Sequence, residues 1–184
     1  MGLVKRLCVM GPCVALALLL PASALAAPLH AYVTSNTGPD GWVSAFTIGA
    51  GGQLASPGPP FGPFYTHGSD PFYLAVSPNG KYMYVANDAA SGSVAEFLVN
   101  RNGTLTNLSV APEPAGGGPQ GIAISPNGQH VYVANQFDNT VSIFDVTGNG
   151  TLAPNGTQAT IGTNLQSPRG VALSPDGNSL YVTN

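Results

Sequence analysis

The sequence predicts an all-β protein: a partial β-propeller of about three to three and a half blades, each built of four antiparallel strands. The main observation is a Tyr-Val-Thr/Ala pattern ending in Asn, which begins at Tyr32, Tyr84, Tyr132 and Tyr181. The spacings between these tyrosines are 52, 48 and 49 residues. Repeats of this length, made of short apolar runs between Gly, Pro and Asn turns, are typical of propellers with one blade per repeat.

Residues 1–26 predict a signal peptide. Lys5 and Arg6 precede an apolar run, residues 7–20, that is short for a membrane span. Ala24-Leu25-Ala26 is a small-x-small signature, so we expect cleavage before Ala27 and a secreted or periplasmic protein with no membrane span after processing. The alternative is an uncleaved anchor.

The composition of the remaining chain excludes several classes of function. Both cysteines, Cys8 and Cys13, lie in the signal peptide, so the processed chain has no disulfide, thiolate ligand or cysteine nucleophile. Residues 27–184 carry 3 basic and 8 acidic side chains, a net charge of −5. Without a basic patch, nucleic acid is not an expected partner. Strand-length apolar runs argue against disorder.

Each repeat begins with an inner strand that a proline opens, at residues 71–77, 119–125 and 168–174. Proline is tolerated at the start of a strand because its missing N–H costs least there. A Ser-Pro-Asn/Asp-Gly turn follows, in which proline presets φ and glycine takes the left-handed exit. The Tyr-Val segment is then the second strand.

A third and a fourth strand complete the repeat. The third strands are expected at residues 43–48, 94–99 and 141–146, with a phenylalanine at the same place in each: Phe46, Phe97 and Phe144. Asn-Gly at residues 102–103 and 149–150 predicts hairpin turns, each followed by Thr-Leu and a fourth strand.

The repeats divide the chain into four blade parts, at about residues 28–60, 70–114, 119–161 and 168–184. The two middle parts are whole blades. The first part is expected to lack an inner strand, and the last contains only strands one and two. Propellers usually have four to eight blades, so the sequence indicates a truncated chain or an arc that closes with partner chains. Open blade edges predict self-association.

The composite unit resembles the YVTN/lactonase-type propeller repeat over nearly all of residues 30–184. The Gly-Thr-Leu segments at residues 103–105 and 150–152 are more similar to the lactonase branch, which includes 6-phosphogluconolactonases and muconate-lactonizing enzymes. The resemblance implies a seven-bladed ring. It also implies a central tunnel lined by polar His, Arg and Glu groups that follow the opening proline. At those places the chain has Phe72, Gln120 and Arg169, and of these Arg169 alone fits, with Gly170 in place of a histidine.

Three residues are candidate catalytic groups. The guanidinium of Arg169, at the start of an inner strand, could bind a carboxylate or phosphate. The alternative is that Arg169 is a solvated residue at the rim. Asp70 could be a general base or the partner of Arg169, although a turn cap before Pro71 is the favoured reading. His67, in the proline-rich connection 56–68, could be an acid or base, or a solvated loop residue.

Other polar residues favour structural roles. His30 and His130 stand where other copies have Tyr82 and Ser179, which is typical of a packing or edge position. The repeated asparagines could ligate calcium, but their return in each blade favours a turn cap bonded to the backbone; they are Asn87, Asn135 and Asn184. We expect no cofactor and no metal. No Gly-x-Ser-x-Gly elbow or phosphate loop occurs in the sequence.

Two functions remain open. The first is an exported binding or scaffold module for a protein or a small molecule such as a lactone. The low charge and the missing tunnel histidine favour it. The second is a 6-phosphogluconolactonase-like lactone hydrolase whose active site needs further blades, which Arg169 and the Gly-Thr-Leu turns favour. A fold of this kind hosts many activities and cannot decide between them.

Overall fold

The computed structural model describes residues 16–18, 29–36, 40–56, 62–156, 159–160 and 166–184. The predicted cleavage site at Ala24–Ala26 lies outside these residues. Over the described ranges the regular structure is β-strand, and no helix there has the length and apolarity to cross a membrane. The all-β prediction is confirmed.

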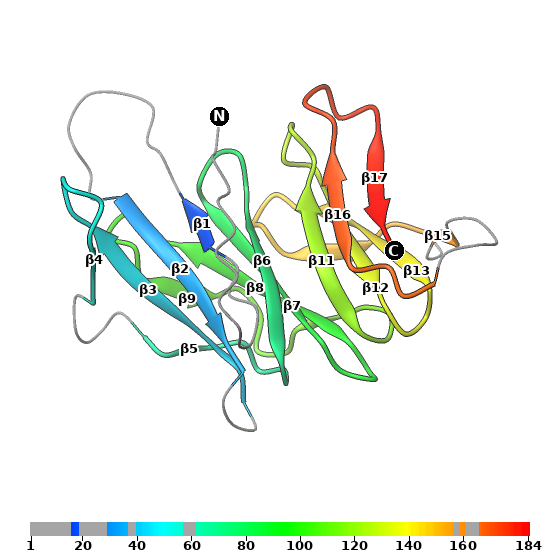
Figure 1. Ribbon diagram of the computed structural model, residues 1–184, viewed down its shortest axis with the longest axis horizontal. Helices are drawn as coiled ribbons and strands as arrows, with labels where there is room; N and C mark the ends of the chain where they lie inside the picture. Colours follow the sequence, from blue (N-terminus) through cyan, green and yellow to red (C-terminus); the bar gives the residue numbers. More distant parts are fainter. Residues whose placement is uncertain (1–15, 19–28, 37–39, 57–61, 157–158, 161–165) are drawn as a thin grey trace.

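The strands form four antiparallel sheets that follow one another along the chain (Figure 1). The first contains β1 (Leu16–Leu18), β2 (Leu29–Ser35), β3 (Trp42–Ile48), β4 (Leu54–Ala55) and β5 (Phe64–Tyr65). The second contains β6 (Pro71–Val76), β7 (Tyr82–Asn87), β8 (Ser93–Val99), β9 (Leu105–Asn107) and β10 (Glu113–Pro114). The third contains β11 (Pro119–Ile124), β12 (His130–Asn135), β13 (Thr140–Val146), β14 (Leu152–Pro154) and β15 (Ala159–Thr160). The fourth is β16 (Gly170–Leu173) with β17 (Leu180–Thr183).

The predicted fourth strand of each blade is divided into two short strands. β9 and β10 both pair with β8, at opposite ends of it: Leu105 lies opposite Val99, whereas Glu113 lies opposite Val94. β4 and β5 divide the edge of β3 in the same way, and β14 and β15 divide that of β13. In each of the first three sheets, two short strands thus take the place of one continuous fourth strand at the outer edge.

The first sheet corrects one expectation. The sequence predicted no inner strand in the first blade, but β1 pairs with β2 where β6 pairs with β7 and β11 with β12. Leu16 to Leu18 belong to the apolar run assigned to the signal peptide. An apolar stretch of three residues can satisfy a vacant strand edge as well as serve as a leader, and composition does not distinguish the two.

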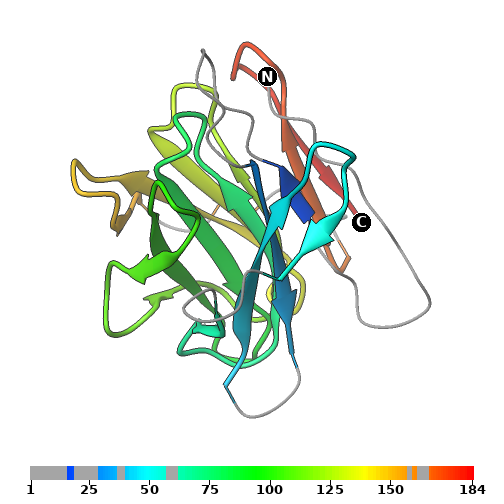
Figure 2. The same cartoon turned by 90° about the vertical axis from the view of Figure 1, so that its left-hand side faces the viewer.

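The hydrophobic core lies between the sheets. One cluster joins the first and second sheets through Tyr32, Val43, Met83 and Phe97, all fully buried. A second joins the second and third sheets through residues that include Tyr84, Val94, Val131 and Phe144. Both faces of the second sheet are thus covered, which explains why apolar residues occur at both parities of its strands. Figure 2 shows the first sheet nearest the viewer with the other sheets behind it.

Tyrosine hydroxyls connect one sheet to the next. Tyr32 Oη donates to the carbonyl of Gly103 over 3.0 Å, and Tyr84 Oη donates to the carbonyl of Gly150 over 2.8 Å. Each glycine has a positive φ, 85° and 90°, in the Asn-Gly turn of the following sheet. Burial raises the pKa of both tyrosines, so both hydroxyls stay protonated and can donate. The first Tyr and the Gly of the repeat therefore form one contact between neighbouring blades.

Candidate functional site

The inner strands form the surface on which a site can be built. β6, β11 and β16 lie side by side, with β11 between the other two (Figure 1). β6 and β11 each contain a register shift next to the opening proline, between Pro71 and Tyr73 and between Pro119 and Ile122. A bulge of this kind redirects the side chain of the residue that it contains.

Gln120 lies in the bulge of β11 and joins two sheets. Its side chain is buried, and its Nε2 donates to Asp88 Oδ2 over 3.1 Å and also to Gln136 Oε1. Asp88 directly follows β7, and Gln136 directly follows β12. The backbone holds both in place, since the N–H of Asp88 donates to the carbonyl of Asp70 and that of Gln136 to the carbonyl of Gly118. We name Asp88, Gln120 and Gln136 the inner polar cluster.

Asp88 is the titratable member of the inner polar cluster. Burial raises the pKa of its carboxyl, the hydrogen bond from Gln120 lowers it, the charge of Asp70 raises it, and that of Arg169 lowers it. Its Oδ1 is buried and has no hydrogen-bond partner among the described residues. The carboxyl thus has one oxygen held by Gln120 and one that can still accept a hydrogen bond.

Arg169, beside the fourth sheet, acts on this cluster through its charge, which lowers the pKa of Asp88. It immediately precedes β16 and is exposed, and its N–H donates to the carbonyl of Thr183 over 2.9 Å. The fourth and third sheets approach closely at Gly121: a Cβ there would lie 2.6 Å from the carbonyl oxygen of Arg169. Glycine at this place permits the close approach of the backbones on which Gln120 and Arg169 lie.

The three predicted site residues are placed as follows. Arg169 and Asp70 both act electrostatically on Asp88. Asp70 is exposed with φ of 51°, and its backbone carbonyl accepts the N–H of Asp88. The turn cap expected of its side chain stays a prediction. His67 is exposed with φ of 54° in the connection before Asp70. Catalytic roles for the three stay predictions.

Sequence reasoning missed Asp88 and Gln136. Each directly follows the asparagine that ends a second strand, so the two occupy the same place in successive repeats. The signal that could have found them is this repetition: a polar side chain stands directly after the second strand in both repeats, next to the inner strand. Gln120 occupied a predicted tunnel position but was set aside because it is neither His nor Arg.

The repeated asparagines lie inside the sheets and do not bond as predicted. Asn87 Nδ2 donates to Ser93 Oγ, and Asn135 Nδ2 donates to the hydroxyls of Thr140 and Ser142. Both asparagines are fully buried. Their side chains therefore link the second strand to hydroxyls of the third, and the expected bond to the backbone of a turn is wrong. The short serine and threonine side chains leave room for this link.

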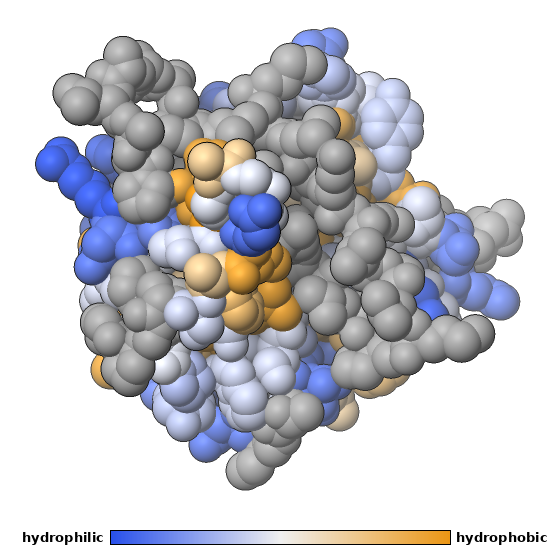
Figure 3. All heavy atoms as spheres, turned by 60° about the vertical axis from the view of Figure 1, so that its left-hand side comes forward, coloured by the Kyte–Doolittle hydropathy of each residue, from blue (hydrophilic) through white to orange (hydrophobic). Residues whose placement is uncertain are grey.

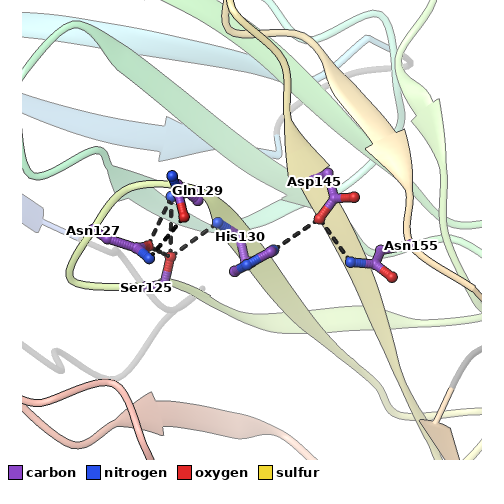
Figure 4. A network of polar contacts seen from close by, with 6 residues as sticks. All are labelled: Ser125, Asn127, Gln129, His130, Asp145 and Asn155. Carbon is purple, nitrogen blue, oxygen red and sulfur yellow. Dashed lines mark hydrogen bonds and ion pairs between the residues drawn. The ribbon is translucent and has the colours of Figure 1, made fainter.

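The two strand histidines have local partners. His130 Nδ1 lies 2.8 Å from Asp145 Oδ1, and Asn155 Nδ2 donates to the same oxygen over 2.7 Å (Figure 4). The pair joins β12 to β13, where His130 lies opposite Asp145. His30 is buried beside Gly103, and burial lowers its pKa. Over the part of the chain that the structure describes, no three His, Cys, Asp or Glu side chains are grouped to hold a metal.

Comparison with solved structures finds relatives of the same architecture. A candidate 6-phosphogluconolactonase from Bacteroides fragilis aligns with a TM-score of 0.58 and 25% identity over 84% of this chain and 39% of its own. The periplasmic gluconolactonase PpgL of Pseudomonas aeruginosa aligns with 0.57 and 23% over 84% and 47%. A protein of unknown function from Desulfotomaculum acetoxidans aligns with 0.64 and 18% over 93% and 56%.

The chain therefore spans about half the length of these proteins, or less. Comparison with curated proteins gives no significant match. A family model described as lactonase, 7-bladed beta-propeller, matches residues 26–121 and 112–184, which together include every repeat. The chain belongs to this lactonase family of β-propellers.

Proposed function

We propose that the inner-strand surface binds a small polyhydroxylated acid or its lactone, as an exported binding module. The observation that supports this most directly is the hydrogen-bonded meeting of Asp88, Gln120 and Gln136 at the inner strands, where the charge of the exposed Arg169 also lowers the pKa of Asp88. A guanidinium suits a carboxylate or phosphate, and amide and carboxylate groups suit sugar hydroxyls.

The ligand class also follows from the relatives. A gluconolactonase and a candidate 6-phosphogluconolactonase are proteins named for sugar lactones, and both share this fold. The aligned part is less than half of each of these two proteins. Export remains a proposal that rests on the signal-peptide pattern of residues 1–26.

Calorimetric titration with gluconate, 6-phosphogluconate and glucono-δ-lactone tests the binding function. Arg169→Met should weaken binding of the two anions about ten- to hundredfold, the loss expected when a charged hydrogen bond is removed. Arg101→Met is the matched control, because Arg101 is an exposed arginine in the turn after β8. Equal losses in the two variants, or no binding by the unaltered chain, would contradict the proposal.

Lactone hydrolysis is the second candidate, and the raised pKa of Asp88 favours it. A carboxylate with a raised pKa is a better base toward water than an ordinary one. In that reaction Asp88 takes a proton from water and the hydroxide oxygen bonds to the lactone carbonyl carbon. The bond from this carbon to the ring oxygen then breaks, and the ring oxygen takes the proton from Asp88 to become a hydroxyl. Release of acid from glucono-δ-lactone, followed at constant pH, should be lost in Asp88→Asn if the chain hydrolyses. Binding without acid release identifies a binding module.

A further inference from the structure

The surface of this chain is polar but carries few charges. Charged residues make up 7% of the sequence, and on the side where the first sheet lies polar side chains surround an apolar group at the middle of the view (Figure 3). Asparagine supplies part of this uncharged polarity and is one of the chemically labile residues of proteins. It is most labile before glycine, whose missing Cβ lets its nitrogen approach the preceding side chain. The sequence has five such Asn-Gly pairs, beginning at Asn79, Asn102, Asn127, Asn149 and Asn155.

Four of the five pairs are held in turns by two hydrogen bonds each. In every one of these turns the glycine N–H donates to the carbonyl three residues earlier, over 2.8 to 3.0 Å. The Oδ1 of the asparagine accepts the backbone N–H two residues later, over 2.9 to 3.3 Å. The glycine nitrogen must therefore leave its acceptor before it can reach the asparagine side chain. These pairs lie at residues 79–80, 102–103, 127–128 and 149–150.

The fifth pair, Asn155-Gly156, is held differently. Both residues are exposed, directly after β14. A Cβ at Gly156 would meet nothing within 4 Å, and among the described residues no carbonyl accepts its N–H. The side chain of Asn155 is held through its nitrogen instead, because Nδ2 donates to Asp145 Oδ1 over 2.7 Å (Figure 4). The nitrogen of Gly156 can therefore turn toward Cγ of Asn155 without first breaking the turn bond that restrains the other four glycines.

We propose that Asn155 is a site of spontaneous deamidation, which converts an attraction between β13 and the end of β14 into a repulsion. The nitrogen of Gly156 bonds to Cγ of Asn155 and the bond from Cγ to Nδ2 breaks. Nδ2 leaves as ammonia, with the proton that Gly156 loses. Water then opens the cyclic imide at one of its two carbonyls, and the product is aspartate or isoaspartate.

The product changes the contacts of Asp145. Its Oδ1 now lies 2.8 Å from His130 Nδ1 and accepts from Asn155 Nδ2 (Figure 4). After deamidation residue 155 has no side-chain N–H to donate, and a second carboxylate stands beside that of Asp145. Like charges this close repel each other, even at the surface. The proposal does not depend on the inner polar cluster.

Peptide mapping by mass spectrometry tests the site on the full chain, incubated at mildly alkaline pH. Asn155 should convert at least about tenfold faster than each of the other four asparagines, the factor expected when ring closure must first break one or two hydrogen bonds. In urea, where the turns are lost, the five rates should become similar. A rate at Asn155 that is no faster than the others in the folded chain overturns the proposal. The same preference for Asn155 in urea also overturns it, because the local sequence would then be the cause.

Hydrogen exchange of the variant Asn155→Asp tests the structural consequence. The backbone N–H of residue 155 donates to the carbonyl of Ile143. It should exchange about tenfold faster in this variant, as expected when repulsion costs about one hydrogen bond. Adding Asp145→Asn to Asn155→Asp removes the second carboxylate and should restore the protection. Unchanged exchange in Asn155→Asp, or no recovery in the double variant, overturns the repulsion.

Asn127→Asp is the matched control. Asp176 stands at the same place in the last Ser-Pro-Asn/Asp-Gly turn, and its Oδ1 accepts the N–H of Asn178 just as Asn127 Oδ1 accepts that of Gln129. An acid at residue 127 therefore keeps the bond of its turn, and this variant should leave the exchange of residue 155 unchanged. Faster exchange at residue 155 in both variants would show that added charge in general, rather than the contact with Asp145, is the cause.

Discussion

Tyr84 and Tyr181 occupy the same place in their sheets and have opposite environments. Each lies opposite an alanine of its inner strand. Tyr84 is 0% exposed and donates to the carbonyl of Gly150 in the third sheet, whereas Tyr181 is 61% exposed. Their immediate sequences are alike, so the difference comes from the neighbouring sheet. In this chain the repeated tyrosine is buried by residues of the next repeat rather than by those of its own repeat.

The largest effect should come from truncating the covered tyrosine. Tyr84→Ala removes a buried ring and its hydrogen bond, so the free energy of unfolding should fall by about 3–5 kcal/mol, the usual loss for a large aromatic residue in a core. Tyr181→Ala removes an exposed ring and should change it by less than about 0.5 kcal/mol. Urea unfolding followed by circular dichroism measures both. Similar losses in the two variants would mean that the neighbouring sheet does not provide the stabilisation.

A glycine between the third and fourth sheets provides the next test. Gly121→Ala places a Cβ 2.6 Å from the backbone carbonyl oxygen of Arg169, and backbone cannot move aside as a flexible side chain can. We expect a loss of about 1–3 kcal/mol from overpacking, with weaker binding of anions through the displaced Arg169.

Gly148→Ala is the control for this substitution. A Cβ at Gly148 meets nothing within 4 Å, and its φ is outside the left-handed region. It should leave the urea midpoint almost unchanged. If Gly121→Ala also left the urea midpoint unchanged, the close approach of β11 and β16 would not be important for stability.

A smaller effect isolates the hydrogen bond between the sheets. Tyr84→Phe keeps the ring but leaves the carbonyl of Gly150 without its donor, and the net loss for one such bond is about 1 kcal/mol. Tyr181→Phe should leave the free energy of unfolding unchanged. The difference between the two phenylalanine variants, measured by urea unfolding, should be much smaller than that between the two alanine variants. A larger loss for Tyr84→Phe than for Tyr84→Ala would contradict this division between ring burial and hydrogen bond.

Much of the fold could be predicted because its signals are local and repeated. The Ser-Pro-Asn-Gly turn depends on its own residues: Asn79 Oδ1 accepts the N–H of Lys81, and Ser77 Oγ accepts that of Tyr82. Such bonds are encoded within a few positions, and they return in the two following Ser-Pro-Asn/Asp-Gly turns. β1 could not be predicted this way, because its pairing with β2 depends on a vacant edge rather than on a strand or turn signature of its own.

The candidate site was less predictable, because it is assembled across sheets. Gln120, Asp88 and Gln136 meet only when the bulge in β11 turns Gln120 toward the ends of β7 and β12. A search for charged residues directly after the opening proline finds Arg169. It does not find Gln120, which is uncharged, or Asp88, which follows the second strand instead. The electrostatic link of Arg169 to Asp88 likewise depends on how closely the sheets stack, which Gly121 permits.

The smallest expected effect concerns a buried acid in the covered interface. Glu96 is 4% exposed, and its Oε1 accepts the N–H of Leu152 in the third sheet over 2.6 Å. Ala45 and Ile143 lie at the equivalent places, opposite Tyr32 and Tyr132. Burial raises the pKa of Glu96, the Leu152 N–H lowers it, and the charge of Glu113 raises it.

The pH dependence of stability follows from that direction. Because the folded pKa lies above the ordinary value of about 4.3, the folded chain holds the proton more tightly than the unfolded chain does. The stabilisation from Glu96 is therefore complete below about pH 4 and is lost as the pH rises through the folded pKa. Glu96→Gln keeps an oxygen that can accept the Leu152 N–H and has no proton to lose. Urea midpoints measured from pH 3.5 to pH 7.5 should fall less steeply in this variant than in the unaltered chain, and a steeper fall in the variant would show that the carboxylate form is the one favoured by the interface.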